Sequence, residues 1–339
     1  MSGDNVPYHL RPNKAVERHL FLELLLHVDR YFSIDACEYI GLGGPFSEDH
    51  RLIHGAFPKT SLVSIEDNDV VWERQRFNLP YNGIKRFQKS LGEFIAGFER
   101  KKRSIFWLDY ANANEYLAQI QEFEFLLTKL DELDVVKITL NANPGTLRGS
   151  NNQVGPDDAR RPETADEMRI KRIERLTQQL AGYIDPLTTK SHMTREFLPS
   201  VLALAVRSAA AKGLRARASQ GLYFQPLASF AYADSEHQML TVTGVVLTEA
   251  RRDEFLQKTE LPEWAHSSLV WGLVREVVVP AMSPREKLFV DQKLPCRSVS
   301  ALHDELGFRF QSDPDASLAL LTAYAAYYRY YPNFQRTLV

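Results

Sequence analysis

A glycine-rich turn and an acid one strand later are the residues of this sequence best suited to hold a ligand. The string YIGLGGPFSED sets three glycines after a short apolar run, where the lack of side chains lets a phosphate or carboxylate approach backbone amides. Glu66 ends the next apolar run about 25 residues after Gly41, where an acid can accept hydrogen bonds from both ribose hydroxyls of a nucleoside. A tight turn and a solvated acid are the alternatives. The predicted cofactor-binding residues are Gly41, Gly43, Gly44, Asp49, Glu66, Asp67 and Ser90.

A second polar group follows the apolar run IFWL. Asp109 comes directly after it, and a carboxylate there can hold a cofactor's amino group, accept a proton from a substrate, or bind a metal. Burial beside Trp107 would raise the pKa of Asp109 and favour a general base, whereas capping of the next helix is the alternative. Asn141 ends a later apolar run and could orient a polar substrate or only form a turn. The predicted catalytic residues are Asp109, Tyr110, Asn141 and Lys14.

Basic residues recur on one face of the first predicted helix. Arg11, Lys14 and Arg18 fall on that face, so they could bind a phosphate-bearing substrate or cover the pocket, and a solvated face is the alternative. His50 and His54 have the i, i+4 spacing that could bind a metal, but no further ligands lie near them in sequence. We therefore predict no metal site.

Alternating helices and strands position these residues. Apolar residues at helical spacing predict a helix over 13–31, with Asn13 as its N-cap, and Ser47 is the expected N-cap of a second helix. The other helices are expected at 70–77 and between Asp109 and Leu130. Short apolar runs predict strands at 34–40, 61–65, 84–87, 105–108 and 135–140. Because this alternation favours a doubly wound parallel sheet, the ends of all five strands are expected on one rim, with Ser90 near the adenine of a cofactor.

The pattern changes after Gly145. A loop rich in Gly, Asn, Pro and Arg is expected at 147–162, then helices at 163–183 and 195–211, a β-hairpin from 222–232 and 239–247, and a mostly helical tail from 251. An antiparallel hairpin that closes a five-strand parallel sheet is typical of class I methyltransferases rather than dehydrogenases. We predict an N-terminal helical segment (1–32), a Rossmann-like core (33–145), a helical insertion (146–215), the hairpin (216–250) and a helical C-terminal region (251–339).

Composition bounds the partners and the compartment. The 339 residues are 44% hydrophobic and 25% charged with a net charge of −2, typical of a globular protein without a general basic field for nucleic acid. Nucleic acid stays an alternative partner through the arginines between Arg148 and Arg172. Cys37 and Cys296 are the only cysteines, and the sequence shows neither a signal peptide nor an apolar run of about 18 residues. We expect a cytoplasmic protein that does not contact membranes.

The end of the chain, AYAAYYRYYPNF, is rich in aromatic residues. Tyr324, Tyr327 and Tyr331 belong to it, together with Phe334. We expect these rings to anchor the last helix to the core or to a partner subunit, which could be a second copy of this chain. Stacking on nucleic-acid bases beside Arg329 is the alternative.

Several of these strings together resemble one protein family. RPNKAVER, YIGLGGPFSEDHRLIH, SIED, RQRFN, FWLDY and TLNANP, over residues 8–145, resemble a group of bacterial proteins described as methyltransferase-like or as O-methyltransferases, and YYRYYPNF resembles its C-terminus. The resemblance implies a class I fold that binds S-adenosylmethionine. It also implies that one pocket is lined by Arg11, Lys14, Asp49, Arg51, Glu66, Asn78, Asp109, Tyr110, Asn141 and Pro144.

Two departures from the wider methyltransferase pattern keep alternatives open. Tyr39 stands where the first motif usually has an acid, and the Asn-Pro-Pro-aromatic signature of amino-methyltransferases is absent after the fourth strand. The leading hypothesis is an S-adenosylmethionine-dependent methyltransferase whose acceptor the sequence does not identify. The alternatives are a catalytically degenerate Rossmann-like subunit that binds a nucleotide or serves in an assembly, and a nicotinamide-dependent oxidoreductase.

Overall fold

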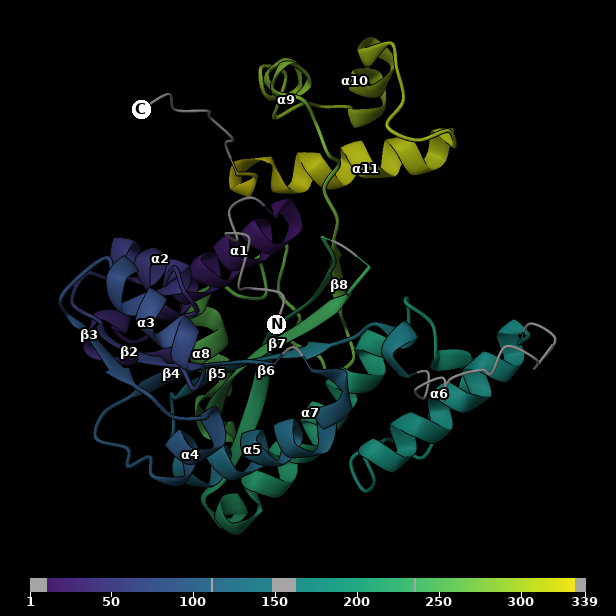
Figure 1. Cartoon of the computed structure of the whole chain (residues 1–339). Coiled ribbons are helices and arrows are strands. Elements are labelled where there is room, and N and C mark those ends of the chain that lie inside the picture. Colours follow the sequence, from purple (N-terminus) through teal and green to yellow (C-terminus); the bar gives the residue numbers. More distant parts are fainter. Residues whose placement is uncertain (1–10, 111, 148–162, 235, 333–339) are drawn as a thin grey trace.

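A single eight-stranded sheet organises the part of the chain that the computed structural model describes, residues 11–110, 112–147, 163–234 and 236–332. The strand order is β3-β2-β1-β4-β5-β7-β6-β8 (Figure 1). The strands are β1 (Glu38–Leu42), β2 (Ser61–Ile65), β3 (Ile84–Phe87), β4 (Ser104–Asp109), β5 (Val135–Asn141), β6 (Leu222–Tyr232), β7 (Met239–Thr248) and β8 (Arg275–Val277). Strands β1 to β5 are parallel, and β7 is antiparallel to both β5 and β6. The predicted doubly wound sheet, closed by a hairpin, is confirmed.

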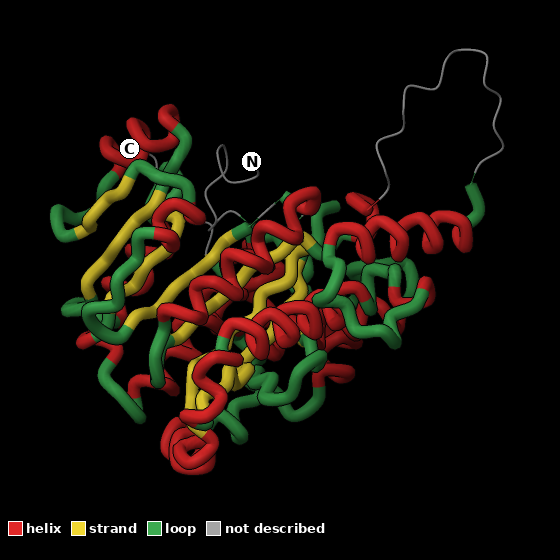
Figure 2. The backbone as a smooth tube through the Cα atoms, turned by 90° about the horizontal axis from the view of Figure 1, so that it is seen from below, coloured by secondary structure: helices red, strands yellow, loops and turns green. Residues whose placement is uncertain are grey.

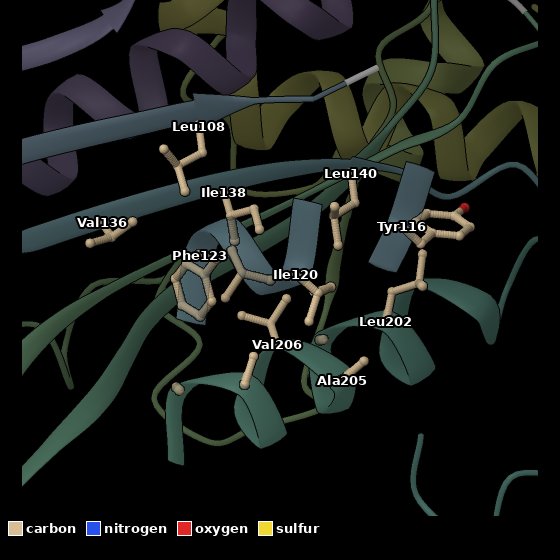
Figure 3. Close-up of a cluster of buried hydrophobic side chains, with 14 of the residues drawn as sticks. Leu108, Tyr116, Ile120, Phe123, Val136, Ile138, Leu140, Leu202, Ala205 and Val206 are labelled. Carbon is tan, nitrogen blue, oxygen red and sulfur yellow. The ribbon is translucent and has the colours of Figure 1, made fainter. Parts of the chain in front are cut away.

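Helices cover both faces of the sheet, as Figure 2 shows with helices in red and strands in yellow. One buried core lies between the sheet and α4, α5, α6 and α7, and the other between the sheet and α1, α2, α8 and the C-terminal helices. In the first core, Ile138 and Leu140 of β5 face Ile120 and Phe123 of α5, with α7 beyond them (Figure 3). The helices are α1 (Pro12–Asp29), α2 (Glu48–Ala56), α3 (Asp69–Asn78), α4 (Leu91–Ala96), α5 (Tyr116–Lys129), α6 (Ala165–Gln179), α7 (Leu198–Gly213), α8 (Glu249–Thr259), α9 (Pro284–Asp291), α10 (Val299–Leu306) and α11 (Pro314–Tyr327).

The C-terminal region is mostly helical and contains one strand that the sequence pattern did not predict. Strand β8 has three residues, too few to show an alternation, and pairs in parallel with β6. Helices α9 to α11 lie above α1 in Figure 1. Tyr324, Tyr327 and Tyr331 are buried in the core on that side, so the aromatic run anchors the last helix within the protein. Phe334, Arg148 and the rest of the predicted loop up to residue 162 lie outside the described residues.

Two predicted helix caps are wrong. Helix α1 begins at Pro12, and the side chain of Asn13 instead donates to the carbonyl oxygen of Ala233 and accepts from the backbone of Val279. Ser47 precedes α2 with a left-handed φ of 50°, so its hydroxyl makes no capping bond and is buried without a hydrogen-bond partner. An N-cap side chain reaches its target only from an extended backbone, which Ser47 does not have. Among the described helices, none is long and apolar enough to cross a membrane.

Candidate functional site

Strand register brings the predicted site residues to one edge of the sheet. Leu42 at the end of β1 pairs with Ile65 at the end of β2, so the glycine turn and Glu66 emerge side by side. Strand β4 lies on the other side of β1, and its last residue, Asp109, pairs with Thr139 near the end of β5. The carboxyl ends of parallel strands form the crevice in which doubly wound proteins bind ligands. The turn, Glu66, Asp109 and Asn141 therefore share one edge.

The glycines of the turn serve different purposes. A Cβ on Gly43 would lie 2.5 Å from Nε2 of Gln75 and closer still to Oγ of Ser64, so this glycine permits close packing of the turn against α3 and β2. Gln75 fixes the turn by donating to the carbonyl oxygen of Gly44 at 2.9 Å. Gly44 has a φ of +50°, and a Cβ there would meet no atom within 4 Å. The open space that a ligand needs therefore lies beside Gly44.

Glu66 is a buried acid at the end of β2. Its side chain is part of a local turn, because Oε1 accepts from the backbone N–H of Asn68 at 2.9 Å and Asn68 in turn caps α3. The neighbouring acid, Asp67, is exposed. Burial and a fixed carboxylate distinguish Glu66 as the better candidate of the two for binding a ribose.

Ser90 marks the start of α4, a short helix that the sequence analysis did not predict. Its hydroxyl accepts from the backbone of Glu93 at 3.2 Å, and the Glu93 carboxylate accepts from Ser90 in return, forming a capping box. The hydroxyl is thus engaged within the helix start. Contact of Ser90 with an adenine ring stays a prediction.

Asp109 lies beside cations from α1, and this environment reverses the expected direction of its pKa shift. The Asp109 carboxylate, 21% exposed, is 3.9 Å from the Arg18 guanidinium. Burial alone would raise the pKa of Asp109, but Lys14 and Arg18, together with Thr139 and Lys137, outweigh it and hold that pKa below its ordinary value. The expected rise in the pKa of Asp109 is therefore wrong, and its role in proton transfer stays a prediction. Asp109 is not a helix cap either, since Asn112 caps the short helical turn that precedes α5.

The basic stripe of α1 faces inward. Lys14 and Arg18 are buried, so the solvated-face alternative is wrong for both. Arg18 forms a bidentate ion pair with Asp49, with distances of 2.7 and 3.4 Å, which places Asp49 beneath α1. Burial and the neighbouring Arg18 lower the pKa of Lys14 to about 8, although Asp109 and Asp49 oppose the shift.

Tyr110 and Asn141 are both tied into local structure. Tyr110 points away from the Asp109 cluster, and its hydroxyl donates to Glu122 of α5 at 2.6 Å, so burial and that carboxylate raise its pKa well above the ordinary value. The Asn141 side chain accepts from the backbone of Asn143 at 2.9 Å, and its carbonyl oxygen accepts from Tyr116. Turn formation accounts for these contacts of Asn141. A substrate role for Tyr110 or Asn141 stays a prediction.

A buried ion pair next to this cluster was not predicted from the sequence. Lys137 of β5 is fully buried, and its ammonium lies 2.7 Å from Glu17 of α1, whose carboxylate also accepts from Thr241 of β7. The same ammonium lies 3.4 Å from the centre of the Trp107 ring. A lysine flanked by apolar residues in the run VVKITL was the available signal.

The histidines do not form a metal site in the described residues. His50 is buried, and its Nε2 lies 3.0 Å from the carbonyl oxygen of Val63. His54 packs against the ring of Tyr81. Within the described ranges, no group of three or more His, Cys, Asp or Glu side chains is arranged to hold a metal ion.

Comparisons with known proteins identify the family. No curated protein matches the chain. Among solved structures it is similar to a probable spermidine synthase from Corynebacterium glutamicum, with 12% identity and a TM-score of 0.34 over 39% of this chain and 50% of that one. It is also similar to cofactor-bound Rv0187 from MTB, with 14% identity and a TM-score of 0.35 over 67% of this chain and 79% of that one. A third similar structure is the N-methyltransferase NodS from Bradyrhizobium japonicum, with 8% identity and a TM-score of 0.34 over 68% of this chain and 97% of that one. Residues 6–339 match the family described as "Putative O-methyltransferase", and the chain therefore belongs to that family.

Proposed function

We propose that this protein transfers the methyl group of S-adenosylmethionine to an acceptor. The observation that carries the proposal is the position of two carboxylates, Glu66 and Asp109, on either side of the glycine turn at the carboxyl edge of the sheet. Membership of an O-methyltransferase family supports it. S-adenosylmethionine supplies a methyl group on a sulfonium, two ribose hydroxyls and an ammonium.

The residues at this edge fit such a cofactor. Gly44 borders open space, so backbone groups of the turn are accessible to a ligand. Glu66 has a fixed carboxylate at the end of β2, and a carboxylate has enough lone pairs to accept from Asn68 and from ribose hydroxyls together. Asp109 carries a negative charge that complements an ammonium. Both ends of the cofactor therefore have a matching group in this chain.

The lowered pKa of Asp109 supports one of its predicted roles over the others. A carboxylate that stays ionised is a weak proton acceptor and a good partner for a cation. Transfer of a methyl group to a hydroxyl releases the proton of that hydroxyl, and Lys14, whose pKa is lowered to about 8, is the better candidate to accept it. We assign cation binding to Asp109 and proton acceptance to Lys14. In-line placement of the acceptor supplies much of the remaining catalysis.

The test is calorimetric binding of S-adenosylmethionine. Glu66→Ala should weaken binding at least about tenfold, because hydrogen bonds to a charged group are worth about 1.5–3 kcal/mol. Glu73→Ala is the control, since Glu73 is an exposed acid on α3 that pairs with Arg76. Unchanged affinity in Glu66→Ala would contradict the assigned role.

A degenerate binding protein is the second candidate, because Tyr39 stands in place of the usual motif acid. Its ring is buried against His50, with the two ring centres 5.2 Å apart, so no acid faces the cofactor from that position. The two candidates differ in one assay with a methyl-labelled donor and cell extract. A methyltransferase moves label into an acceptor, whereas a degenerate protein binds the donor and leaves it intact.

A cytoplasmic location is also part of this proposal. Cys37 and Cys296 are both free cysteines, which suits a reducing compartment. Burial raises the pKa of Cys37 to about 11, so its thiol is unreactive at neutral pH. Fractionation of cells that express the protein would test the location.

A further inference from the structure

A threonine hydroxyl lies behind the Asp109 carboxylate. Thr139 of β5 pairs directly with Asp109 of β4 and is fully buried. The indole N–H of Trp107 donates to Oγ1 of Thr139 at 2.9 Å. An indole N–H can only donate, so the threonine oxygen must accept, and its one hydrogen is left for another partner. Because Asp109 and Thr139 pair across neighbouring strands, their side chains lie side by side on one face of the sheet, and hydrogen bonding by Thr139 is one of the causes that lower the pKa of Asp109.

Packing fixes the tryptophan that orients this hydroxyl. Trp107 is buried, with its ring in edge contact with Phe21 of α1 at 5.3 Å between ring centres. The Lys137 ammonium lies 3.4 Å from the ring centre and is itself held by Glu17. Cation–π contact is strongest in a desolvated place such as this one. Trp107 therefore has little freedom to rotate its N–H away from Thr139.

The positive charge around Asp109 and the hydrogen bond that orients its carboxylate come from different residues. Lys14 and Arg18 of α1 and Lys137 of β5 face it with positive charge, and Asp49 of α2 shares the guanidinium of Arg18. Point charges favour an anion without fixing how its carboxylate is turned. A hydrogen bond is directional and does fix it.

We propose that Thr139, aligned by Trp107, is a positioning residue that holds the Asp109 carboxylate in the orientation required to bind the cofactor's ammonium. The inference rests on the proposed function, because it assigns Asp109 a cofactor to bind. It concerns Thr139 and Trp107, two residues that do not themselves touch the cofactor. Loss of the hydroxyl should therefore weaken binding through Asp109.

The experiment compares Thr139→Val with Thr139→Ser. Valine keeps the shape and removes the hydroxyl, whereas serine keeps the hydroxyl. Calorimetry with S-adenosylmethionine from about pH 3 to about pH 8, a range that begins below the ordinary aspartate pKa of about 3.9, should show about tenfold weaker binding near neutral pH for Thr139→Val and a change under about threefold for Thr139→Ser. Because the missing bond raises the pKa of Asp109, the pH at which binding is half lost should rise by about one unit in Thr139→Val.

Three controls separate the outcomes. Thr243→Val removes a buried hydroxyl from β7, on the same face of the sheet as Thr139, and should leave the pH profile of binding unchanged. Trp107→Phe keeps a ring and removes the N–H, so its profile should lie between those of wild type and Thr139→Val. Carbon-13 NMR titration of Asp109 without any cofactor should show the same upward shift in Thr139→Val, which tests the hydrogen bond independently of the proposed function.

Two results would overturn the inference. Wild-type affinity and pH profile in Thr139→Val would show that the hydroxyl does not position Asp109. Equal impairment in Thr139→Val and Thr139→Ser would show that only the shape of the threonine matters. Absence of S-adenosylmethionine binding by the wild-type protein would instead reject the proposed function, while the NMR titration would still decide the hydrogen bond.

Discussion

The buried ion pair beneath α1 gives a prediction about stability that the structure makes quantitative. Lys137 and Glu17 are 0% and 1% exposed, and their charged atoms are 2.7 Å apart. Lys137→Met keeps the stem of the side chain between the rings of Trp107 and Phe21 but leaves the Glu17 carboxylate buried with the hydroxyl of Thr241 as its donor. Removing one member of a buried pair costs about 3–5 kcal/mol. With an unfolding entropy of about 2.1 cal/mol/K per residue, that loss lowers Tm by about 4–7 °C for 339 residues.

Denaturant unfolding and calorimetry measure this loss. The double variant Glu17→Gln/Lys137→Met removes both charges and should recover at least half of the lost free energy of unfolding, because no uncompensated charge stays buried. Lys85→Met is the matched control, since Lys85 lies on a strand with a 68% exposed side chain, and it should change stability by under about 0.5 kcal/mol. A Lys137→Met protein within about 1 kcal/mol of wild type, or a double variant no better than the single one, would refute the reasoning.

The pH dependence gives a second signature of the same pair. Burial lowers the pKa of Lys137 to about 8, against about 10.4 in an unfolded chain. Between these two values the unfolded chain binds this proton more often than the folded one, so the free energy of unfolding rises with pH across that window. The Lys137→Met variant has no ammonium at this position and therefore lacks this rise in the free energy of unfolding. The difference in unfolding free energy between wild type and variant should therefore grow from about pH 8 to about pH 10.4.

Two further substitutions test the edge of the sheet. Gly43→Ala should lower the free energy of unfolding by at least about 1–3 kcal/mol in a denaturant titration, because the new methyl group would overlap Gln75 and Ser64, and wild-type stability would show that the turn packs differently. Tyr110→Phe should change the affinity for S-adenosylmethionine by under about twofold in calorimetry, because the hydroxyl donates to Glu122, and a tenfold loss would show that the hydroxyl contacts the cofactor.

Much of the fold was predictable because its strands are short apolar runs with distinct ends. The glycine turn after β1 and the acid after β2 mark the carboxyl edge, and parallel topology then assigns Asp109 and Asn141 to the same edge. Helix starts were less predictable. Ser47 has the right side chain for a cap, but its left-handed backbone conformation is set by packing of the turn, which the local sequence does not encode.

The sequence predicted the edge of the sheet at which the candidate site residues meet, but it predicted the wrong direction for the pKa shift of Asp109. Asp109 was expected to have a raised pKa because the sequence shows Trp107 two residues away and burial is the first effect to consider. Lys14 and Arg18 reverse that result, but they lie about 90 residues earlier in the chain. Only the packing of α1 against β4 and β5 reveals them. The resemblance to O-methyltransferases implied that Lys14 and Asp109 line one pocket but did not include Arg18, and the family match confirms the resemblance itself.

Helix α1 therefore determines the charge of the site although it contributes nothing to the sheet. Its inward face carries Lys14, Glu17 and Arg18, and each of these meets an oppositely charged side chain from the sheet or from α2. A helix with charges on its buried face gains little from hydrophobic burial there, and such pairs are a weak source of stability compared with apolar side chains of similar volume. The arrangement makes sense if its benefit is to keep Asp109 ionised next to the glycine turn. Replacing this face with apolar residues could then preserve the fold while abolishing cofactor binding.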